Sequence, residues 1–471
     1  MKLEIKRMRF ALISVLLLCA MARQTGAATI TVTNTHDSGP GSLRQALANA
    51  NNGDSINFAV TGAISLTSGG LGITKNVTIS GPGANQLAVN GNQALFVFGV
   101  FPQRTVSISG LSIRNAQVGV DNQGTLSVSD CVLRGNSSAA LYNHAGAFMT
   151  VANCNISNNS GTGAYNNQGT LAVSSCVLSG NSDTGIYNSG TATVSNCALS
   201  GNSGGMLSWG TLTVSNCFVS GNSNAGIFNG DTLTVSNCDI SGNTYDGIGN
   251  HAFSSGTANL TLVNSNVSDN HFIGISNYVD EFATLTVTMR STTVSGNSAG
   301  GVLAQGGGVI FGGSIQVTVT DCTVSGNSFW GGIHATGLTN LFVTDSTISG
   351  NSANAGFPDG DSGGGIYGAD LVENSTISGN SAATSGGGIY GGSIDIVNST
   401  ISGNSAGTSG GGIYELGASH DVWLRVTNST ITGNSAPSGG GIYNKVYVID
   451  SVVEISNTIL NAGVSGENIF Q

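Results

Sequence analysis

The sequence has little charge, little proline and few aromatic residues, and each shortage excludes a class of structure. Only 8% of its 471 residues are charged, compared with about 25% in a typical globular domain. With so few charges and 72 glycines, helices would lack ion pairs between turns, which excludes a helical bundle or coiled coil. Only five prolines, and glycines without a three-residue period, exclude collagen. A hydrophobic content of 39% is sufficient for a buried core and argues against disorder.

Positive charge is scarcer still. The 13 Lys and Arg residues face 24 Asp and Glu residues, and beyond residue 28 the remaining charges sum to about −15. The few scattered cations do not form the basic stripe that neutralises phosphates. We therefore expect no nucleic-acid partner.

The N-terminus has the pattern of a secretory signal peptide. The basic stretch Met1 to Arg9 is followed by an apolar run, Phe10 to Ala22, of 13 residues. That run is shorter than the ~20 residues that a membrane-spanning helix needs. Small residues suited to cleavage follow at Ala20–Ala22 and Gly26–Ala28. We predict that residues 1–28 are a signal peptide and that the mature protein is secreted, either extracellular or at the cell surface.

The rest of the chain is a repeat of about 25 residues. Its most regular feature is an Asn that recurs at 136, 159, 181, 202, 222, 243, 270, 297, 327, 351, 380, 404 and 434. Between these Asn residues, apolar and polar residues alternate over three to five positions, as in Leu233–Ser236, and Gly, Asn and Ser separate the stretches. A propeller blade needs about 40 residues. Three short strands per repeat instead predict an all-β fold, a right-handed parallel β-helix of about 15–17 coils.

Two columns of the repeat are predicted to face the core. A small residue, first Cys and later mostly Ser, stands five residues before the recurrent Asn. An Ile, Leu or Val stands two residues after this small residue, on the same face of the strand. The recurrent Asn itself is expected in a turn, in a left-handed conformation, with side-chain amides bonded from coil to coil. Six of the cysteines share the small-residue column: Cys131, Cys154, Cys176, Cys197, Cys217 and Cys238. Because Ser replaces Cys in later coils, we expect buried free thiols rather than disulfides or metal ligands.

The chain divides into three segments. After residues 1–28 come residues 29–120, which lack the Asn repeat, and then the regular repeats of residues 121–471. Ser42 starts a capping box, and apolar residues follow it at helical spacing. Since a solenoid needs a cap over its first coil, we predict that Ser42–Ala50 is a capping helix.

Several motifs resemble known families. The stretches TVTNTHDSGPGSLRQALANAN (31–51) and ISGPGANQLAVNG (79–91) resemble the start of bacterial secreted right-handed β-helix proteins. The motifs GGGIY (363–367) and Ile-Ser-Gly-Asn (377–380) are similar to repeats of polymorphic outer membrane proteins, although Ile, Leu or Val replaces Phe. Members of that family end in a membrane-anchoring β-barrel, whereas only about 37 residues follow Asn434, so we expect no integral membrane barrel.

The resemblance also implies an enzymatic alternative, because right-handed β-helices include pectate lyases and polygalacturonases. The NTD, DD, GHG and RIK motifs of polygalacturonases are absent. The acids mostly occur singly, which is typical of solvated loop residues. The six histidines, His36, His144, His251, His271, His334 and His420, share no spacing and are expected at the surface.

Insertions that lengthen particular turns supply the candidate ligand-binding residues. On solenoids such insertions often gather on one face, and aromatic rings beside carboxylates suit sugars. The candidates are Tyr278, Asp280, Glu281, Trp330, His334, Glu415, Asp421 and Trp423. Asp359 and Asp361 have the i,i+2 spacing of a calcium-loop fragment, which makes Ca²⁺ the one cofactor to consider. The alternative is that all these residues are solvated loops.

The sequence therefore predicts a non-catalytic adhesion or structural protein. Its expected partner is a polysaccharide or the surface of a host or neighbouring cell, and end-to-end self-association is a further expectation. A polysaccharide-active enzyme, either pectate-lyase-like or a glycoside hydrolase, is the alternative. Rows of outward Thr and Ser, such as Thr191, Thr193 and Ser195, also resemble the flat hydroxyl arrays of ice-binding solenoids.

Overall fold

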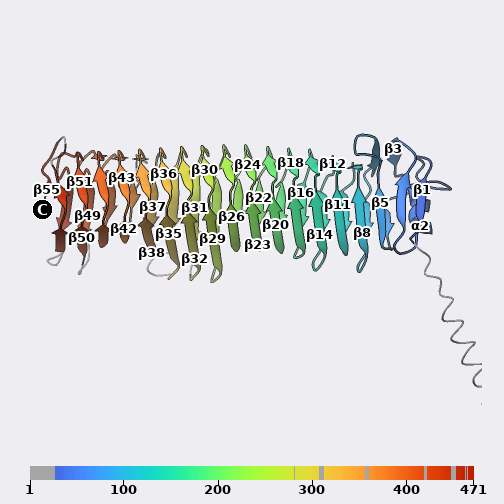
Figure 1. Ribbon diagram of the computed structural model, residues 1–471, viewed down its shortest axis with the longest axis horizontal. Coiled ribbons are helices and arrows are strands. Elements are labelled where there is room, and N and C mark those ends of the chain that lie inside the picture. The colour runs from blue at the N-terminus through green and yellow to red at the C-terminus, as the bar shows by residue number, and fades with distance from the viewer. Residues whose placement is uncertain are drawn as a thin grey trace, which may run out of the picture.

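The protein is a straight rod of stacked coils (Figure 1). The computed structural model describes residues 27–280, 282–306, 312–354, 356, 360–417, 422–446, 452–461, 463 and 465–470. Most of the predicted signal peptide lies outside the described residues. Within them, three long sheets contain 18, 17 and 17 strands, a short fourth sheet contains three, and the coil is right-handed. The prediction of a parallel β-helix of about 15–17 coils is confirmed.

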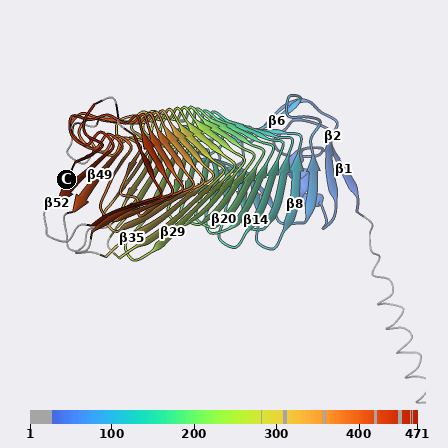
Figure 2. The same ribbon diagram turned by 60° about the vertical axis from the view of Figure 1, so that its left-hand side comes forward.

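Each coil contributes one strand to each of three sheets, here called A, B and C. A typical coil contains β8 (Thr105–Ser109) in sheet A, β9 (Ser112–Arg114) in sheet B and β10 (Val118–Asn122) in sheet C. Each strand pairs in parallel with its counterpart one coil later: β11 (Thr125–Ser129), β12 (Val132–Arg134) and β13 (Ala139–Asn143). Figure 2 shows the strands stacked along the rod. Because the registers repeat, one sequence position occupies the same place on a face in many coils.

The sheets run almost the full length of the rod. Sheet A begins at β1 (Thr29–Val32) and ends at β53 (Val452–Ser456), and sheet B extends from β3 (Gly62–Ser65) to β54 (Ile459–Leu460). Sheet C extends from β4 (Leu71–Ile73) to β55 (Ile469–Phe470). The middle strands of sheet C are β16 (Thr162–Asn166), β19 (Ile186–Asn188), β22 (Met206–Ser208), β25 (Ile227–Asn229), β28 (Ile248–Ala252) and β31 (Ile273–Val279).

The two predicted core columns are buried. Leu199 and Ile240 have no exposed surface, and Cys197 and Cys238 have at most 4%. All seven cysteines of the described residues are free. Neighbouring cysteines lie one coil apart, so that the N–H of Cys176 donates to Sγ of Cys197 at 3.4 Å. The small-residue column therefore fills the core without cross-linking it.

The recurrent Asn forms the predicted ladder of amide hydrogen bonds. Asn222 Nδ2 donates to Oδ1 of Asn243 at 2.9 Å, and Oδ1 of Asn222 accepts from Nδ2 of Asn202 at 3.2 Å. The prediction that this Asn is left-handed was wrong. The preceding Gly221 has the positive φ instead, +63°, because a residue without Cβ adopts it freely and leaves Asn222 to point inward.

A second Asn ladder lies in sheet C and was not predicted. It runs through the Asn of the GIYN-type motif, as when Nδ2 of Asn166 donates to Oδ1 of Asn188 at 2.7 Å. Its members include Asn122, Asn143, Asn166, Asn188, Asn229, Asn250 and Asn277. Two buried ladders thus bond successive coils through side chains as well as through backbone.

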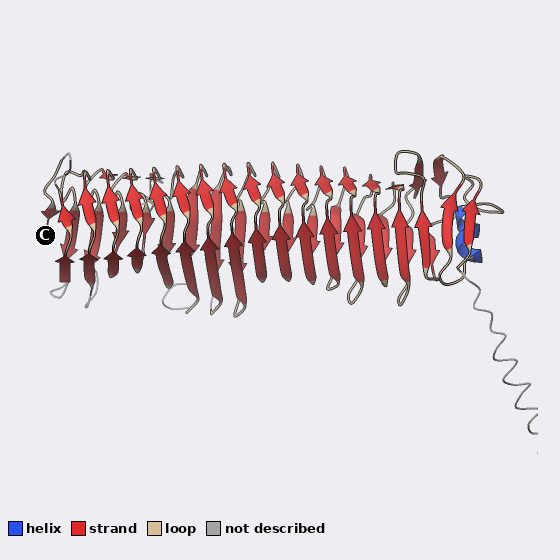
Figure 3. Ribbon diagram, viewed as in Figure 1, coloured by secondary structure: helices blue, strands red, loops and turns tan. Residues whose placement is uncertain are grey.

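The predicted cap forms the only helix of the described residues, α2 (Leu43–Asn49), at the N-terminal end of the rod (Figure 3). Ser42 is its N-cap, and its hydroxyl accepts from the N–H of Gln45. Leu43 and Ala46 are buried against the first coil. Among the described residues, no helix is long and apolar enough to cross a membrane.

Candidate functional site

One outward position of sheet C carries a line of rings along the rod, here called the aromatic row. Its members, in register from coil to coil, are Tyr142, Tyr165, Tyr187, Leu207, Phe228, Gly249, Ser276, Leu303, His334, Tyr367, Tyr390, Tyr414, Tyr443 and Phe470. Tyr165 and Tyr187 stack with centroids 4.4 Å apart. Stacked rings cover one another's faces, so a ligand gains access to a ring face where the row is interrupted.

The first interruption, at Leu207, leaves a hollow of about 300 Å³, here called the Trp209 pocket. The pocket is lined by Asp183, Thr184, Ser203, Gly204, Met206, Leu207, Trp209, Asn224, Ala225 and Phe228. The Trp209 and Phe228 rings form its aromatic wall, with centroids 5.5 Å apart and planes tilted by 56°. Trp209 is 42% exposed. The pocket therefore offers a partly exposed indole beside polar groups.

The polar side of the Trp209 pocket comes from the turn before β19. Asp183 is exposed, and its Oδ2 accepts a hydrogen bond from Oγ1 of Thr162 at 2.8 Å. Thr184 is only 8% exposed, and its Oγ1 has no hydrogen-bond partner. An unpaired buried hydroxyl is unfavourable by about 1–3 kcal/mol, so it requires an explanation.

Gly230 allows Trp209 to take its place in the wall. A Cβ at Gly230 would lie 2.5 Å from Cε3 of the Trp209 indole. The indole therefore rests directly against the backbone of the next coil. The sequence alone gave no reason to select Trp209, because it lies in a short regular turn rather than in an insertion.

The second interruption contains a buried carboxyl group. Asp246 is 6% exposed, its Oδ2 accepts from the Ser276 hydroxyl at 2.6 Å, and its Oδ1 accepts from the Ile273 N–H at 3.2 Å. Burial raises the pKa of Asp246 to about 6, although both hydrogen bonds lower it. Gly249 and Ser276 leave the row without rings here. The prediction that the single acids are solvated was wrong for Asp246, because Ile273 and Ser276 of the next coil bond its carboxyl group and bury it.

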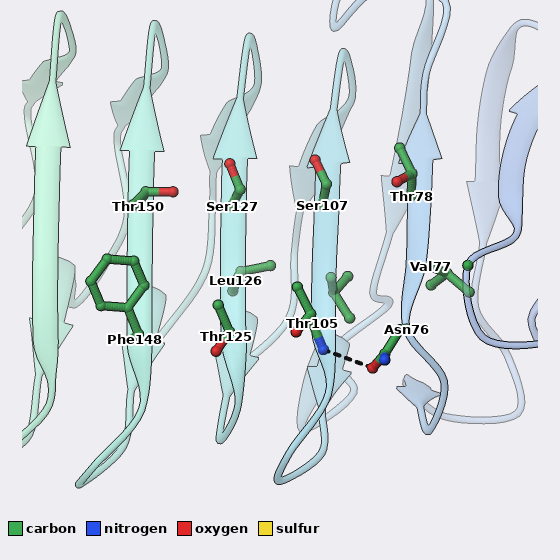
Figure 4. Close-up of a pocket in the computed structure, with 12 residues that line it drawn as sticks. Asn76, Val77, Thr78, Thr105, Ser107, Thr125, Leu126, Ser127, Phe148 and Thr150 are labelled. Carbon is green, nitrogen blue, oxygen red and sulfur yellow. Dashed lines mark hydrogen bonds between the residues drawn. The ribbon is translucent and has the colours of Figure 1, made fainter.

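Sheet A has a second, shallower hollow near the N-terminal end (Figure 4). Its volume is about 420 Å³, and hydroxyl groups of Ser107, Ser127 and Thr150 lie side by side on successive strands within it. The N–H of Thr105 donates to Oδ1 of Asn76 at 2.9 Å, and Phe148 adds a ring that is 42% exposed.

The hydroxyl rows continue along sheet A as predicted. Thr191, Thr193 and Ser195 are in register with Thr211, Thr213 and Ser215 one coil later. The ice-binding role suggested by such rows stays a prediction.

The insertion at Tyr278 brings some of the predicted residues together. Nε2 of His251 lies 3.1 Å from Oδ1 of Asp280, and the His251 and Tyr278 ring centroids are 6.1 Å apart. Burial raises the pKa of Tyr278 to about 12, and its ring packs against a small outer cluster that includes Ile273 and Leu303. Glu281 lies outside the described residues. This group is half-covered and neighbours the Asp246 interruption.

Trp330 and His334 are in contact, with ring centroids 4.8 Å apart. The prediction that His334 is a surface residue was wrong, because it is 2% exposed and stacks on Tyr367 at 4.4 Å within the aromatic row. Burial lowers the pKa of His334 to about 4, so the ring is neutral at pH 7. The Trp330 and His334 rings therefore pack against the stack of the aromatic row and do not form a ligand site.

The late insertion does not assemble as predicted. Glu415 has no exposed surface and occupies an inward position of sheet C, whereas Trp423 is 36% exposed on sheet A. The guanidinium of Arg425 lies 5.3 Å from the Trp423 ring centroid. Asp421 and His420 lie outside the described residues. The alternative interpretation, that Glu415 is a solvated loop residue, is wrong because the side chain is buried.

The proposed calcium fragment is only partly described. Asp361 Oδ1 accepts from the N–H of Gly356 at 2.7 Å, and Asp359 lies outside the described residues. Among the residues that the structure describes, no three His, Cys, Asp or Glu side chains are grouped to hold a metal ion.

Comparison with known proteins gives a family match over most of the chain. The family model described as "Right handed beta helix region" matches residues 46–199, 186–313 and 284–447. No curated protein matches the sequence. The specific resemblance to polymorphic outer membrane protein repeats stays a prediction.

Solved structures share the architecture at low identity. Pectate lyase Pel9A is 13% identical over 74% of this chain and 80% of its own, with a TM-score of 0.32. A GH87 α-1,3-glucanase catalytic unit from Streptomyces thermodiastaticus is 14% identical over 74% and 66%, with a TM-score of 0.38. The A-module of the Azotobacter vinelandii mannuronan C-5 epimerase AlgE6 is 13% identical over 92% and 98%, with a TM-score of 0.32. Likeness at this level carries no argument about what the chain binds.

Proposed function

This chain belongs to the right-handed β-helix family, and we propose that it is a non-catalytic, glycan-binding rod with an adhesive or structural role. The observation that carries the proposal is the Trp209 pocket. It combines an indole that is 42% exposed with a carboxylate, an amide and hydroxyl groups within about 300 Å³. Ligand pockets start at about this volume, and aromatic rings with a few polar groups are their usual lining.

The chemistry of the pocket matches that of a sugar ring. A pyranose has an apolar face that packs on an aromatic ring and hydroxyl groups that need hydrogen-bond partners at its edge. Trp209 and Phe228 supply the first requirement, and Asp183 and Asn224 supply the second. Aromatic side chains bury large contact areas and contribute strongly to the energetics of interfaces.

A retention assay tests the proposal. The purified protein is passed over a panel of immobilised acidic and neutral polysaccharides, with Ca²⁺ and with chelator, and both retention and chain cleavage are scored. We expect retention without cleavage, and loss of retention in Trp209→Ala. Phe218→Ala is the matched control, because Phe218 is also exposed, at 63%, but lies on sheet B away from the pocket. Failure of every polysaccharide to retain the wild-type protein would contradict glycan binding.

A polysaccharide-active enzyme is the second candidate function, and Asp246 is the observation that favours it. A carboxyl group with a pKa of about 6 is suited to proton transfer near neutral pH. Its two hydrogen bonds and burial equally fit a structural role. Release of new reducing ends that disappears in Asp246→Asn would establish catalysis in place of simple binding.

Secretion is part of the proposal. We infer an extracellular or cell-surface location from the basic and apolar pattern of residues 1–28. N-terminal sequencing of the protein recovered from the culture medium or cell surface tests it, with a start near Arg23 or Thr29 expected. A mature chain that still begins at Met1 would contradict it.

A further inference from the structure

We propose that the Trp209 pocket selects an uncharged pyranose unit, such as a neutral hexose or an N-acetylhexosamine, and rejects polyuronates. This inference rests on the proposed function and names the class of sugar that the pocket takes. It uses three independent features: the charge of the surrounding coils, the unpaired hydroxyl of Thr184 and the geometry of the indole.

The charge around the pocket excludes an anionic chain. Between Arg134 and Arg290 the sequence contains no Lys or Arg, but seven acidic residues. The pocket lies in the middle of this stretch, and its exposed acid is Asp183. A polyuronate bound across these coils would bring one carboxylate per sugar to this surface. These coils have no Lys or Arg side chain that could pair with those carboxylates. Removing such charges from water without partners is unfavourable.

The carboxylate of Asp183 suits sugar hydroxyl groups instead. Its Oδ2 accepts a hydrogen bond from Thr162, which fixes the side chain, and Asp183 is exposed and lines the pocket. Hydrogen bonds to a charged acceptor are stronger than neutral ones. Asn224 provides an amide at the opposite edge, where its Oδ1 accepts from the N–H of Ala225.

Thr184 provides the most specific argument. Its Oγ1 is buried without a hydrogen-bond partner although it lines the pocket. Asp183, its neighbour in the chain, already accepts a hydrogen bond from Thr162. A hydroxyl both donates and accepts, so a rotation of the Thr184 side chain that turns Oγ1 into the hollow would let it bond a sugar hydroxyl or an acetamido group. Ligand binding would satisfy the group that is unsatisfied in the free protein.

The size and position of the aromatic wall restrict the ligand to one or two sugar units. The hollow of about 300 Å³ extends over three coils, from Asp183 to Phe228, because Leu207 replaces the ring present in the neighbouring coils. Three neighbouring coils are separated by two spacings of about 4.8 Å, which gives a length of about 10 Å. Further units of a longer chain would lie along the rod outside the pocket.

The test is a binding titration of the full chain with defined oligosaccharides. The panel contains neutral β- and α-linked gluco-hexamers, an N-acetylglucosamine hexamer, and galacturonate and mannuronate hexamers, each with Ca²⁺ and with chelator. We expect binding of one or more uncharged ligands and at least ten-fold weaker binding of both uronates in either condition. The arms with hexose and N-acetylhexosamine identify which uncharged unit fits.

Two variants connect the selectivity to the pocket. Thr184→Val keeps the shape but removes the hydroxyl, and we expect affinity for the uncharged ligand to fall by about five-fold, because one hydrogen bond is lost. The thermal midpoint of the free variant should be equal to or above that of the wild type, since the hydroxyl has no partner there. Gly230→Ala displaces the indole and should also weaken binding, whereas Phe218→Ala should leave it unchanged.

The possible failures are distinguishable. Binding of a uronate as tight as that of any uncharged ligand would overturn the selectivity and leave glycan binding intact. Unchanged affinity in Thr184→Val, with normal folding, would overturn the role of Thr184 and thus the assigned pocket. Absence of binding to every oligosaccharide and polysaccharide would overturn the proposed function itself.

Discussion

The buried Asn ladder makes a strong prediction about stability, and Asn222→Ala is the direct perturbation. Asn222 has no exposed surface. Its Oδ1 accepts from both the backbone N–H and Nδ2 of Asn202, at 3.1 and 3.2 Å. Its Nδ2 donates to Oδ1 of Asn243 at 2.9 Å and to the carbonyl of Leu199 at 3.3 Å. The substitution therefore removes four hydrogen bonds in the rod interior.

The magnitude follows from the groups left behind. Two N–H donors of Asn202 lose their acceptor in a site without solvent, and each buried unsatisfied donor is unfavourable by about 1–3 kcal/mol. We therefore expect the free energy of unfolding to fall by about 2–6 kcal/mol. Ser223→Ala is the matched control, because Ser223 is the next residue and its side chain is exposed. Its effect should stay within about 0.5 kcal/mol.

The assay must resolve single coils, because a solenoid gains stability from nearest-neighbour stacking and need not unfold in one step. Native-state hydrogen exchange of the amides in β21 (Ala198–Ser200) and in β27 (Asp239–Ser241) reports the coils on either side of Asn222. Faster exchange confined to these coils in Asn222→Ala is expected. An exchange pattern equal to that of Ser223→Ala would refute the ladder as a stabilising element.

Three further predictions follow from the buried groups. The raised pKa of Asp246, about 6 against 3.8 in the unfolded chain, means that the folded state favours the protonated acid, so stability is highest below pH 4 and falls as the pH rises to about 6. That loss, about 3 kcal/mol, should be absent in Asp246→Asn when unfolding is compared at pH 4 and pH 7, and an equal loss in both proteins would contradict it. Hydrogen bonding to the neighbouring thiol, together with burial, raises the pKa of Cys176 to about 12, so thiol reagents should not react with the native rod. The denatured, unreduced mature protein should instead show close to seven free thiols, and one or none would indicate disulfides. His334, neutral because burial lowers its pKa to about 4, should show no chemical-shift titration between pH 5 and 8, and a midpoint near pH 6.5 would show that the ring is exposed.

The repeat determined how much of the fold could be predicted from the sequence. The small residue before each Ile, Leu or Val recurs at one spacing, and a strand alternates its faces, so the burial of Cys197 beside Leu199 followed directly. The Asn ladder was predictable for the same reason. The conformation of its members was not, because Gly and Asn both tolerate positive φ, and only the three-dimensional turn assigns it to Gly221.

The candidate site was predicted less well, for a physical reason. Insertions are visible in a sequence, which is why the candidates included Tyr278, Asp280 and Trp330. The residues that contact them in the folded rod could not be predicted from the sequence. The Trp209 pocket forms for two reasons. Leu207 stands at a position of the aromatic row where neighbouring coils have a ring, and Gly230, one coil after Trp209, leaves space for the indole. Such a site depends on residues about 20 positions apart that meet only after the coils stack.

The most direct test of the central claim, glycan binding at Trp209, uses the fluorescence of that indole alone. The chain contains three tryptophans, so the double variant Trp330→Phe, Trp423→Phe leaves Trp209 as the single reporter. Titration with an uncharged oligosaccharide that the wild-type protein retains should give a saturable change in emission with the same affinity as the wild-type protein. Binding that leaves the Trp209 emission unchanged would place the ligand elsewhere on the rod and contradict the account.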